Sequence, residues 1–200
     1  MIDRFIYGVD QLSKTVGHMF AWCLMILTFG TSYEVFVRYV LNAPTSWAFD
    51  FSYLMYGAMF YMAGAYTLSR GGHVRADMFY RLWRPRTQAS VELVLYIVFF
   101  FPGVLALVLS GWQYGYDSMK ILESSVNSPA GVPIWPLKML IPFGAGLLAL
   151  QGVAEVLRCV LCIRNNEWSP RLHDVEELEK QILEEYRKKA EQEGAQGAVR

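Results

Sequence analysis

The stretch RYVLNAPTSWAFDFSYLMYGAMFYMAGAYTLSRGGHVRAD, residues 38–77, decides the fold class of this chain. Its central part, residues 47–68, is apolar over a length that exceeds an ordinary core helix. About 20 mostly apolar residues are enough for a helix to cross the hydrocarbon core of a bilayer. Polar signatures mark both ends: Asn42-Ala43-Pro44 with Trp47 and Asp50, and Arg70-Gly71-Gly72-His73-Val74-Arg75-Ala76-Asp77. The stretch therefore predicts a transmembrane helix with distinctive ends.

Three further windows are apolar over similar lengths: residues 16–39, 91–113 and 134–163. Helices are the open segments that satisfy their own backbone hydrogen bonds in lipid. We therefore predict an all-α membrane protein in which residues 1–166 form a domain of four transmembrane helices. A soluble protein with apolar helices is the alternative. It is disfavoured because each of the four segments would be hydrophobic on every side.

The distribution of charge predicts the orientation of the helices. Lys and Arg number 18, as do Asp and Glu, so the net charge itself carries no information. The first predicted loop, residues 40–46, has no charge, whereas the second holds five arginines: Arg70, Arg75, Arg81, Arg84 and Arg86. Basic loops stay in the cytoplasm, so we expect the second loop and both termini there. These arginines, with His73, either bind lipid headgroups or only determine the topology.

Two segments next to the predicted spans are amphipathic. Residues 2–14 and 74–82 each place apolar side chains on one face at helical spacing. Such helices lie in the headgroup region, so both are predicted to be interfacial. For the first segment, the alternative is that the first transmembrane helix begins early.

The charged tail, residues 167–200, differs in kind from the rest of the chain. It is first acidic and then basic, and its apolar residues follow roughly one stripe. This pattern predicts a cytosolic helix that either docks on a partner or is simply solvated.

Three ionisable residues near the first loop lie close to membrane depth. Glu34 and Arg38 are one turn apart and can pair on one face of the first helix, while Asp50 opens the second. Because the loop between these helices is short, Arg38 and Asp50 should approach each other. We interpret the three residues as a polar clamp between helices. Ion or proton handling is the alternative, because ionisable groups in membranes are costly.

Residues that would carry catalysis or bind a cofactor are scarce. The three histidines, His18, His73 and His173, do not form the facing pairs that a membrane haem requires. Cys159 and Cys162 stand alone on an apolar helix end, so we expect them to be buried and inert. No enzyme activity, metal or cofactor is predicted.

Small residues recur on two of the predicted helices. Gly57 and Gly64 lie on the second helix, and Gly144, Gly146 and Gly152 on the fourth. Such faces let another helix come close, which suits a subunit that packs on something larger.

An ordered set of short motifs resembles one known family. It runs from Arg38-Tyr39-Val40, Asn42-Ala43-Pro44, Trp47 and Asp50, through Leu68-Ser69-Arg70-Gly71-Gly72-His73-Val74-Arg75-Ala76-Asp77, to Glu123-Ser124-Ser125, Pro133-Ile134-Trp135, Pro142-Phe143-Gly144 and Leu150-Gln151. The chain resembles the small membrane subunit, of the DctQ type, of tripartite ATP-independent periplasmic (TRAP) transporters. It departs from the family in its lone Asp50, where a pair of acids is common, and in its tail.

The resemblance implies a role in transport. Such a subunit supports a large multi-helix membrane subunit in the bacterial inner membrane, and a periplasmic binding protein delivers the substrate. Transport is sodium-driven symport of an organic acid anion, a carboxylate or sulfonate. On this interpretation the first and third loops dock the binding protein, with these candidates: Asn42, Pro44, Trp47, Glu123, Ser124, Pro133 and Trp135. A membrane anchor of a redox enzyme and a self-sufficient channel are the alternatives.

Overall fold

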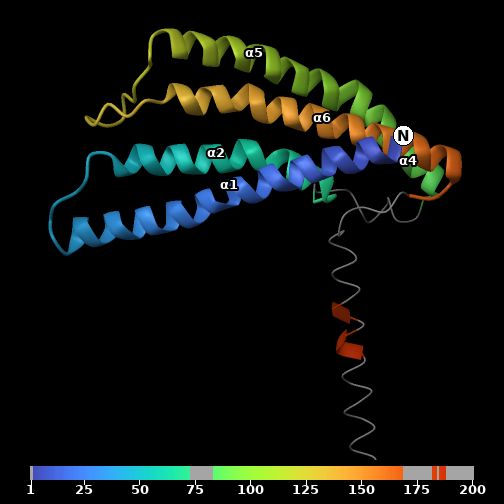
Figure 1. Cartoon of the computed structure of the whole chain (residues 1–200), viewed down its shortest axis with the longest axis horizontal. Coiled ribbons are helices and arrows are strands. Elements are labelled where there is room, and N and C mark those ends of the chain that lie inside the picture. The colour runs from blue at the N-terminus through green and yellow to red at the C-terminus, as the bar shows by residue number, and fades with distance from the viewer. Residues whose placement is uncertain (1, 73–82, 169–181, 184, 188–200) are drawn as a thin grey trace, which may run out of the picture.

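The computed structural model describes residues 2–72, 83–168, 182–183 and 185–187, and it is built from helices (Figure 1). These are α1 (Ile2–Tyr39), α2 (Ala48–Ser69), α4 (Pro85–Leu95), the π-helical segment η1 (Tyr96–Phe100), α5 (Phe101–Lys120) and α6 (Trp135–Asn165). The described ranges contain no strand; an isolated β-bridge pairs Ser124 with Pro133. The all-α prediction is confirmed.

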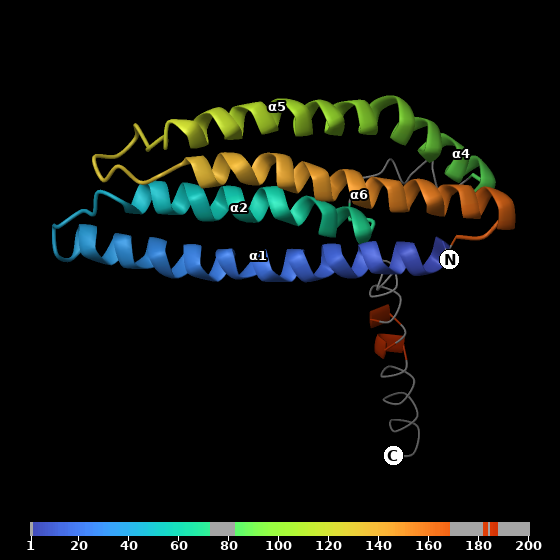
Figure 2. The ribbon, with the colours of Figure 1, turned by 45° about the horizontal axis from the view of Figure 1, so that its top comes forward.

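The long helices lie side by side in one layer, in the order α1, α2, α6 and α5 (Figure 2). We call the end that holds the loops 40–47 and 121–134 the loop end, and the opposite end, where α1 begins, the N-terminal end. With 38 residues, α1 is longer than α2, which has 22. It therefore extends past the end of α2 and contacts α6 directly near the N-terminal end (Figure 1).

The end of α2 accounts for two glycines of the second polar signature. The N–H of Gly72 bonds to the carbonyl of Thr67 at 3.0 Å, and that of Gly71 to the carbonyl of Leu68 at 3.1 Å. Gly71 has a φ of 67°, in the left-handed region. These are the two hydrogen bonds of a Schellman motif, in which glycine is preferred because it has no Cβ. The signature therefore ends the helix by local backbone chemistry.

A π-helical turn precedes Pro102. The N–H of Phe101 bonds to the carbonyl of Tyr96, five residues earlier, instead of the usual four. Pro102 has no N–H and cannot bond to the carbonyl of Val98, so the regular helical pattern would fail here. The π turn takes up this irregularity, and α4, η1 and α5 follow one another as a single rod that curves over α6 (Figure 1).

Small residues pack these helices on one another. A Cβ at Gly144 would collide with the backbone of Tyr61, and one at Gly57 with the side chain of Leu137. A Cβ at Gly152 would likewise collide with the ring of Phe100, whereas Gly146 has open space beside it. Apart from Gly146, the small-residue faces predicted to receive another subunit are thus largely used between α2, α6 and η1.

Three of the four predicted spans have the length and composition of membrane helices. Within the described residues these are Ile2–Tyr39, the rod Pro85–Lys120, and Trp135–Asn165. Their large apolar side chains are mostly exposed, more than a soluble surface tolerates. α2, which contains Asp50 and four tyrosines, is not among these three helices. Its crossing of the membrane stays a prediction.

The N-terminal segment is not a separate interfacial helix. α1 is continuous from Ile2 to Tyr39, and its residues Ile6 and Val9 are buried against Ala154 of α6. The structure therefore corrects that prediction in favour of the alternative, an early start of the first helix, because α1 continues without a break and α6 covers part of the apolar stripe, at Ile6 and Val9. The predicted interfacial helix over residues 74–82, and most of the predicted tail helix, lie outside the described residues.

Candidate functional site

Asp50 connects the start of α2 to the third loop. Its side chain is 1% exposed and accepts a hydrogen bond from the Ser125 hydroxyl at 2.6 Å and another from the Ser128 hydroxyl. The carboxylate also lies in the first turn of α2, where the helix dipole favours negative charge. Asp50 thus holds the third loop against the N-terminus of α2.

Glu34 connects α1 to the first loop. Its carboxylate accepts hydrogen bonds from Arg38, at 2.6 Å from Nη2 and 3.0 Å from Nε, and from the backbone N–H of Thr45 at 3.2 Å. The Thr45 hydroxyl bonds to the same carboxylate. The Arg38 side chain stays half exposed, whereas that of Glu34 is largely buried. The predicted pairing of Glu34 with Arg38 is therefore present.

The predicted approach of Arg38 to Asp50 is wrong. Among the described residues no ion pair joins them, and each belongs to a separate set of contacts. The reason is that Thr45 folds back onto Glu34, while the buried carboxylate of Asp50 receives its donors from the third loop. The three residues therefore fix two loops, and do not form one clamp between α1 and α2.

The third loop is fixed at both of its ends. Ser125 donates its backbone N–H to the Val132 carbonyl at 2.8 Å, and Ile134 donates to the Glu123 carbonyl at 3.0 Å. The Lys138 ammonium lies 2.5 Å from the Glu123 carboxylate and 4.2 Å from the ring centre of Tyr114. The hydrogen bond from Lys138 lowers the pKa of the Glu123 carboxyl below its ordinary value. An ordered loop results.

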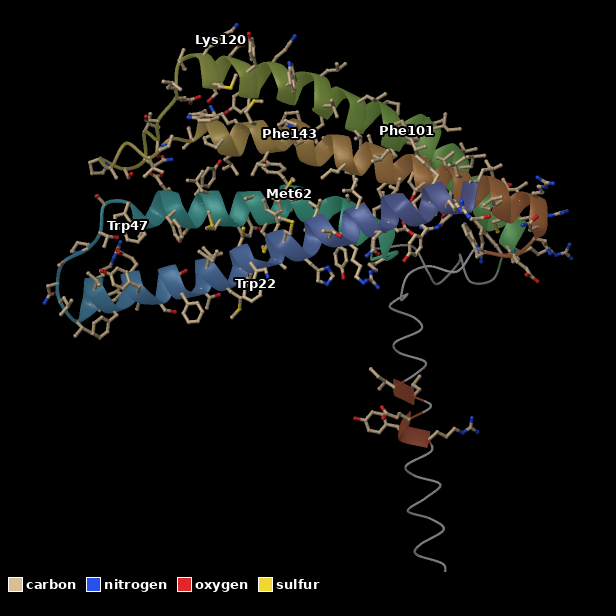
Figure 3. All side chains as sticks on the ribbon, in the orientation of Figure 1. Trp22, Trp47, Met62, Phe101, Lys120 and Phe143 are labelled. Carbon is tan, nitrogen blue, oxygen red and sulfur yellow. The ribbon has the colours of Figure 1, made fainter. Side chains whose placement is uncertain are left out.

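This loop presents apolar side chains to the outside. Val126 is 94% exposed, and Ile121 and Leu122, which directly follow α5, are also exposed. Trp47 of the first loop lies at the same end (Figure 3), where it stacks on Tyr33 and meets Phe51 edge-on. The loop end therefore carries an exposed apolar surface on a fixed backbone.

The predicted docking residues all lie at the loop end. Asn42, Pro44, Trp47, Ser124 and Pro133 are exposed, whereas Glu123 and Trp135 are half-buried. Asn42 has a φ of 50°, in the left-handed region that asparagine tolerates. The structure thus brings the two sets of loop residues to one end of the layer, although their docking role stays a prediction.

The basic residues of the second loop are only partly described. Arg70 ends α2 and lies 5.3 Å from the ring centre of Tyr66, while Arg84 and Arg86 flank the start of α4 and are exposed. Arg84 and Arg86 lie at the N-terminal end, whereas Arg70 lies where α2 ends, short of the start of α1 (Figure 1). His73, Arg75 and Arg81 fall outside the described residues.

A buried polar network at the N-terminal end was not anticipated from the sequence. Arg158 of α6 is 1% exposed and forms ion pairs with Asp10 of α1 and Glu155 of α6. Gln151 donates to Asp10 at 2.8 Å and accepts from Ser13 at 2.8 Å. The signal available was the spacing of residues 151, 155 and 158, which share one face of a helix. The sequence alone does not predict the network, because Asp10 and Arg158 each lie near a predicted helix end, where a charged side chain is expected to be solvated.

The two neighbouring cysteines are buried, as predicted. Cys159 and Cys162 are fully covered and pack around Ala89 of α4. The Cys159 sulfur lies 3.8 Å from the carboxylate of Glu92. Within the described part of the chain, no group of three or more His, Cys, Asp or Glu side chains could hold a metal ion.

Comparison with family models identifies the chain. Residues 15–162, more than half of its length, match the model described as "Tripartite ATP-independent periplasmic transporters, DctQ component". The chain belongs to the DctQ family. The resemblance inferred from the sequence motifs is therefore confirmed, and the protein is a membrane component of a TRAP transporter, not an enzyme. A search of curated proteins found no match.

Membership in the DctQ family also defines the partners in outline. TRAP transporters contain a large membrane subunit and a periplasmic binding protein, and this chain is the small membrane component that works with them. The matched range runs from the first third of α1 into the last turn of α6, and so includes both loops of the loop end. The match gives no support to the redox-anchor alternative.

Proposed function

We propose that this DctQ-family subunit is the scaffold of a sodium-driven symporter that imports an organic acid anion, a carboxylate or a sulfonate. The observation that supports the scaffold role is that the buried charged side chains are already paired within the chain. In the described residues, Asp10, Glu34, Asp50 and Arg158 each bond to side chains of the same chain. Groups that are already paired stabilise helices and loops, so we assign the substrate and sodium sites to the large subunit.

The chain is proposed to cross the bacterial inner membrane four times, with both termini in the cytoplasm. With 22 residues, α2 extends over about 33 Å at 1.5 Å per residue, close to the hydrocarbon thickness of about 30 Å. The loop 40–46 has no charge, whereas arginines gather at the N-terminal end. This asymmetry supports a cytoplasmic N-terminal end and a periplasmic loop end.

An aromatic stripe on α2 is the proposed contact with the large subunit. Phe49, Tyr53, Tyr56 and Phe60 recur every three or four residues, and each is more than half exposed. No described residue of this chain accepts a hydrogen bond from the hydroxyl of Tyr53 or Tyr56. Lipid tails offer no acceptor, whereas a neighbouring transmembrane helix does. We propose this stripe as the contact in place of the small-residue faces, because most of those faces are already packed against other helices of the chain.

The periplasmic binding protein is proposed to dock at the loop end. The support is the exposed apolar side chains of Ile121, Leu122 and Val126, with Trp47 at the same end of the layer, on loops that Asp50 and Glu34 hold in place. A fixed backbone lowers the entropic cost of binding, because the loop is already ordered before the partner arrives.

Reconstitution tests this assignment. Liposomes with the chain, the large subunit and the binding protein should take up a carboxylate or sulfonate only with an inward sodium gradient. The chain alone should transport nothing, and sodium-dependent uptake by it alone would refute the scaffold role.

Co-purification in mild detergent tests the aromatic stripe. Changing Tyr53 and Tyr56 to Phe should weaken recovery of the large subunit by about threefold for each lost hydroxyl, from about 0.6 kcal/mol per membrane hydrogen bond. Tyr116→Phe, at an exposed tyrosine of α5, is the matched control. Equal recovery in all variants would place the contact elsewhere.

A further inference from the structure

The charged side chains at the loop end are all paired or buried within the chain. Residues 31–50 and 112–138, every one of which the structure describes, include seven of them: Glu34, Arg38, Asp50, Asp117, Lys120, Glu123 and Lys138. Six form three ion pairs, with distances from nitrogen to oxygen of 2.6, 3.5 and 2.5 Å: Arg38–Glu34, Lys120–Asp117 and Lys138–Glu123. Asp50 is 1% exposed, and its carboxylate accepts hydrogen bonds from two serine hydroxyls.

The two lysines at this end are also held against aromatic rings. The Lys120 ammonium lies 4.3 Å from the ring centre of Tyr116, and the Lys138 ammonium lies 4.2 Å from that of Tyr114. A closely paired cation and anion act at a distance only as a dipole, and physiological salt screens their field beyond about 8 Å. Electrostatic steering of a partner requires a surface on which one sign of charge predominates. In its described residues, the loop end offers an approaching protein no such surface.

The uncharged surface of this end is rich in exposed apolar side chains. Besides Val126, which is 94% exposed, four more are over half exposed: Val40, Leu41, Ile121 and Leu122. The hydrogen bond from the Ser125 N–H to the Val132 carbonyl closes the third loop around Val126. Val126 comes six residues after the end of α5 and nine before the start of α6, so it does not belong to a lipid-facing helix surface. Groups of exposed apolar side chains mark protein interaction sites.

We propose that the periplasmic binding protein contacts this chain through an uncharged apolar patch of its own, with Val126 as an anchor of a contact that does not depend on ionic strength. The inference rests on the docking proposed above and adds the chemistry of the partner's surface. A charged patch on the partner would lose hydration at the loop end without meeting an available counter-charge. Contacts between opposite charges weaken as salt is added, whereas apolar burial does not, and sulfate strengthens it.

The test measures binding of the binding protein to the complex of both membrane subunits in nanodiscs. Affinity is compared at about 50 mM and about 500 mM potassium chloride, which changes the screening length several-fold. Sodium is held constant because it is the proposed coupling ion. The ratio of the dissociation constants of Val126→Ala and wild type isolates the contribution of this chain, since that of the large subunit cancels. Val126→Ala should weaken binding about tenfold at both salt concentrations, from the loss of two buried methyl groups.

Three control variants make the test specific. Val126→Ile keeps an apolar side chain and should bind like the wild type, which shows that a loss in Val126→Ala is not due to misfolding. The double variant Asp117→Asn, Lys120→Gln removes an exposed ion pair without changing the net charge, and it should alter neither the affinity nor its dependence on salt. Leu12→Ala, at an exposed apolar residue of the N-terminal end, should change nothing.

The outcomes separate this inference from the docking on which it rests. A loss in Val126→Ala that shrinks at high salt, or a tenfold loss in the double variant, would refute the uncharged contact and leave docking intact. If Ile121→Ala weakens binding but Val126→Ala does not, docking stands and Val126 is not its anchor, which overturns the inference. If both variants bind like the wild type, docking at the loop end is itself refuted.

Discussion

Replacing Arg158 by Met should destabilise the helix layer strongly. Arg158 is 1% exposed, and it neutralises Asp10 and Glu155, which are 3% and 1% exposed. Methionine fills a similar volume but leaves both carboxylates buried without this cation. Removing one partner of a buried ion pair costs about 3–5 kcal/mol, because an uncompensated charge stays in the protein interior. Since α1 meets α6 around this network, we expect the loss to separate these two helices first.

The assay is reversible unfolding in mixed micelles, followed by intrinsic tryptophan fluorescence. A loss of about 3–5 kcal/mol would lower the midpoint of thermal unfolding by about 6–20 °C in a chain of this size. Arg164→Met is the matched control, because Arg164 lies on the same helix but is exposed. It should change the free energy of unfolding by less than about 0.5 kcal/mol.

A second variant separates lost charge compensation from lost packing. In the triple variant Arg158→Met, Asp10→Asn and Glu155→Gln, no charge is left in the triad, and much of the stability should return. If Arg158→Met behaves like Arg164→Met, the network contributes nothing to stability. If the triple variant is as unstable as Arg158→Met, the loss arises from packing and the electrostatic explanation fails.

Three further perturbations test the loops and the packing of the layer. Asp50→Ala removes a buried acceptor of two hydroxyls, so we expect a loss of about 1.5–3 kcal/mol and faster protease cleavage in the third loop. Glu123 has a lowered pKa, so its contact with Lys138 should be complete above the ordinary value of 4.5 and be lost as the pH falls below it. Amide exchange in that loop should show this step, and Lys138→Gln should abolish it. Gly152→Ala places a Cβ against a neighbouring ring and should cost about 1–3 kcal/mol in the free energy of unfolding, whereas Gly146→Ala, with open space, should be neutral or stabilising.

The helices and the family were predictable from the sequence, because both depend on local information. The predicted span 47–68 agrees with α2 (Ala48–Ser69), since apolar length and the glycines after Arg70 fix its two ends. The ordered motifs around these ends indicate the DctQ family through residue identity and spacing alone, and the family match agrees with them. A run of apolar residues predicts a helix wherever that helix lies, so these conclusions did not require knowledge of the neighbours.

The tertiary structure alone decided which polar groups meet. Asp10 and Arg158 are 148 residues apart, and their pairing requires α1 to extend past α2 and reach α6. Asp50 likewise bonds to Ser125 and Ser128, not to Arg38, because the third loop folds over the start of α2. Hydropathy gives the length of a helix but neither its rotation nor its neighbour. Since ion pairs and hydrogen bonds act over a few ångströms, they depend on that rotation and order.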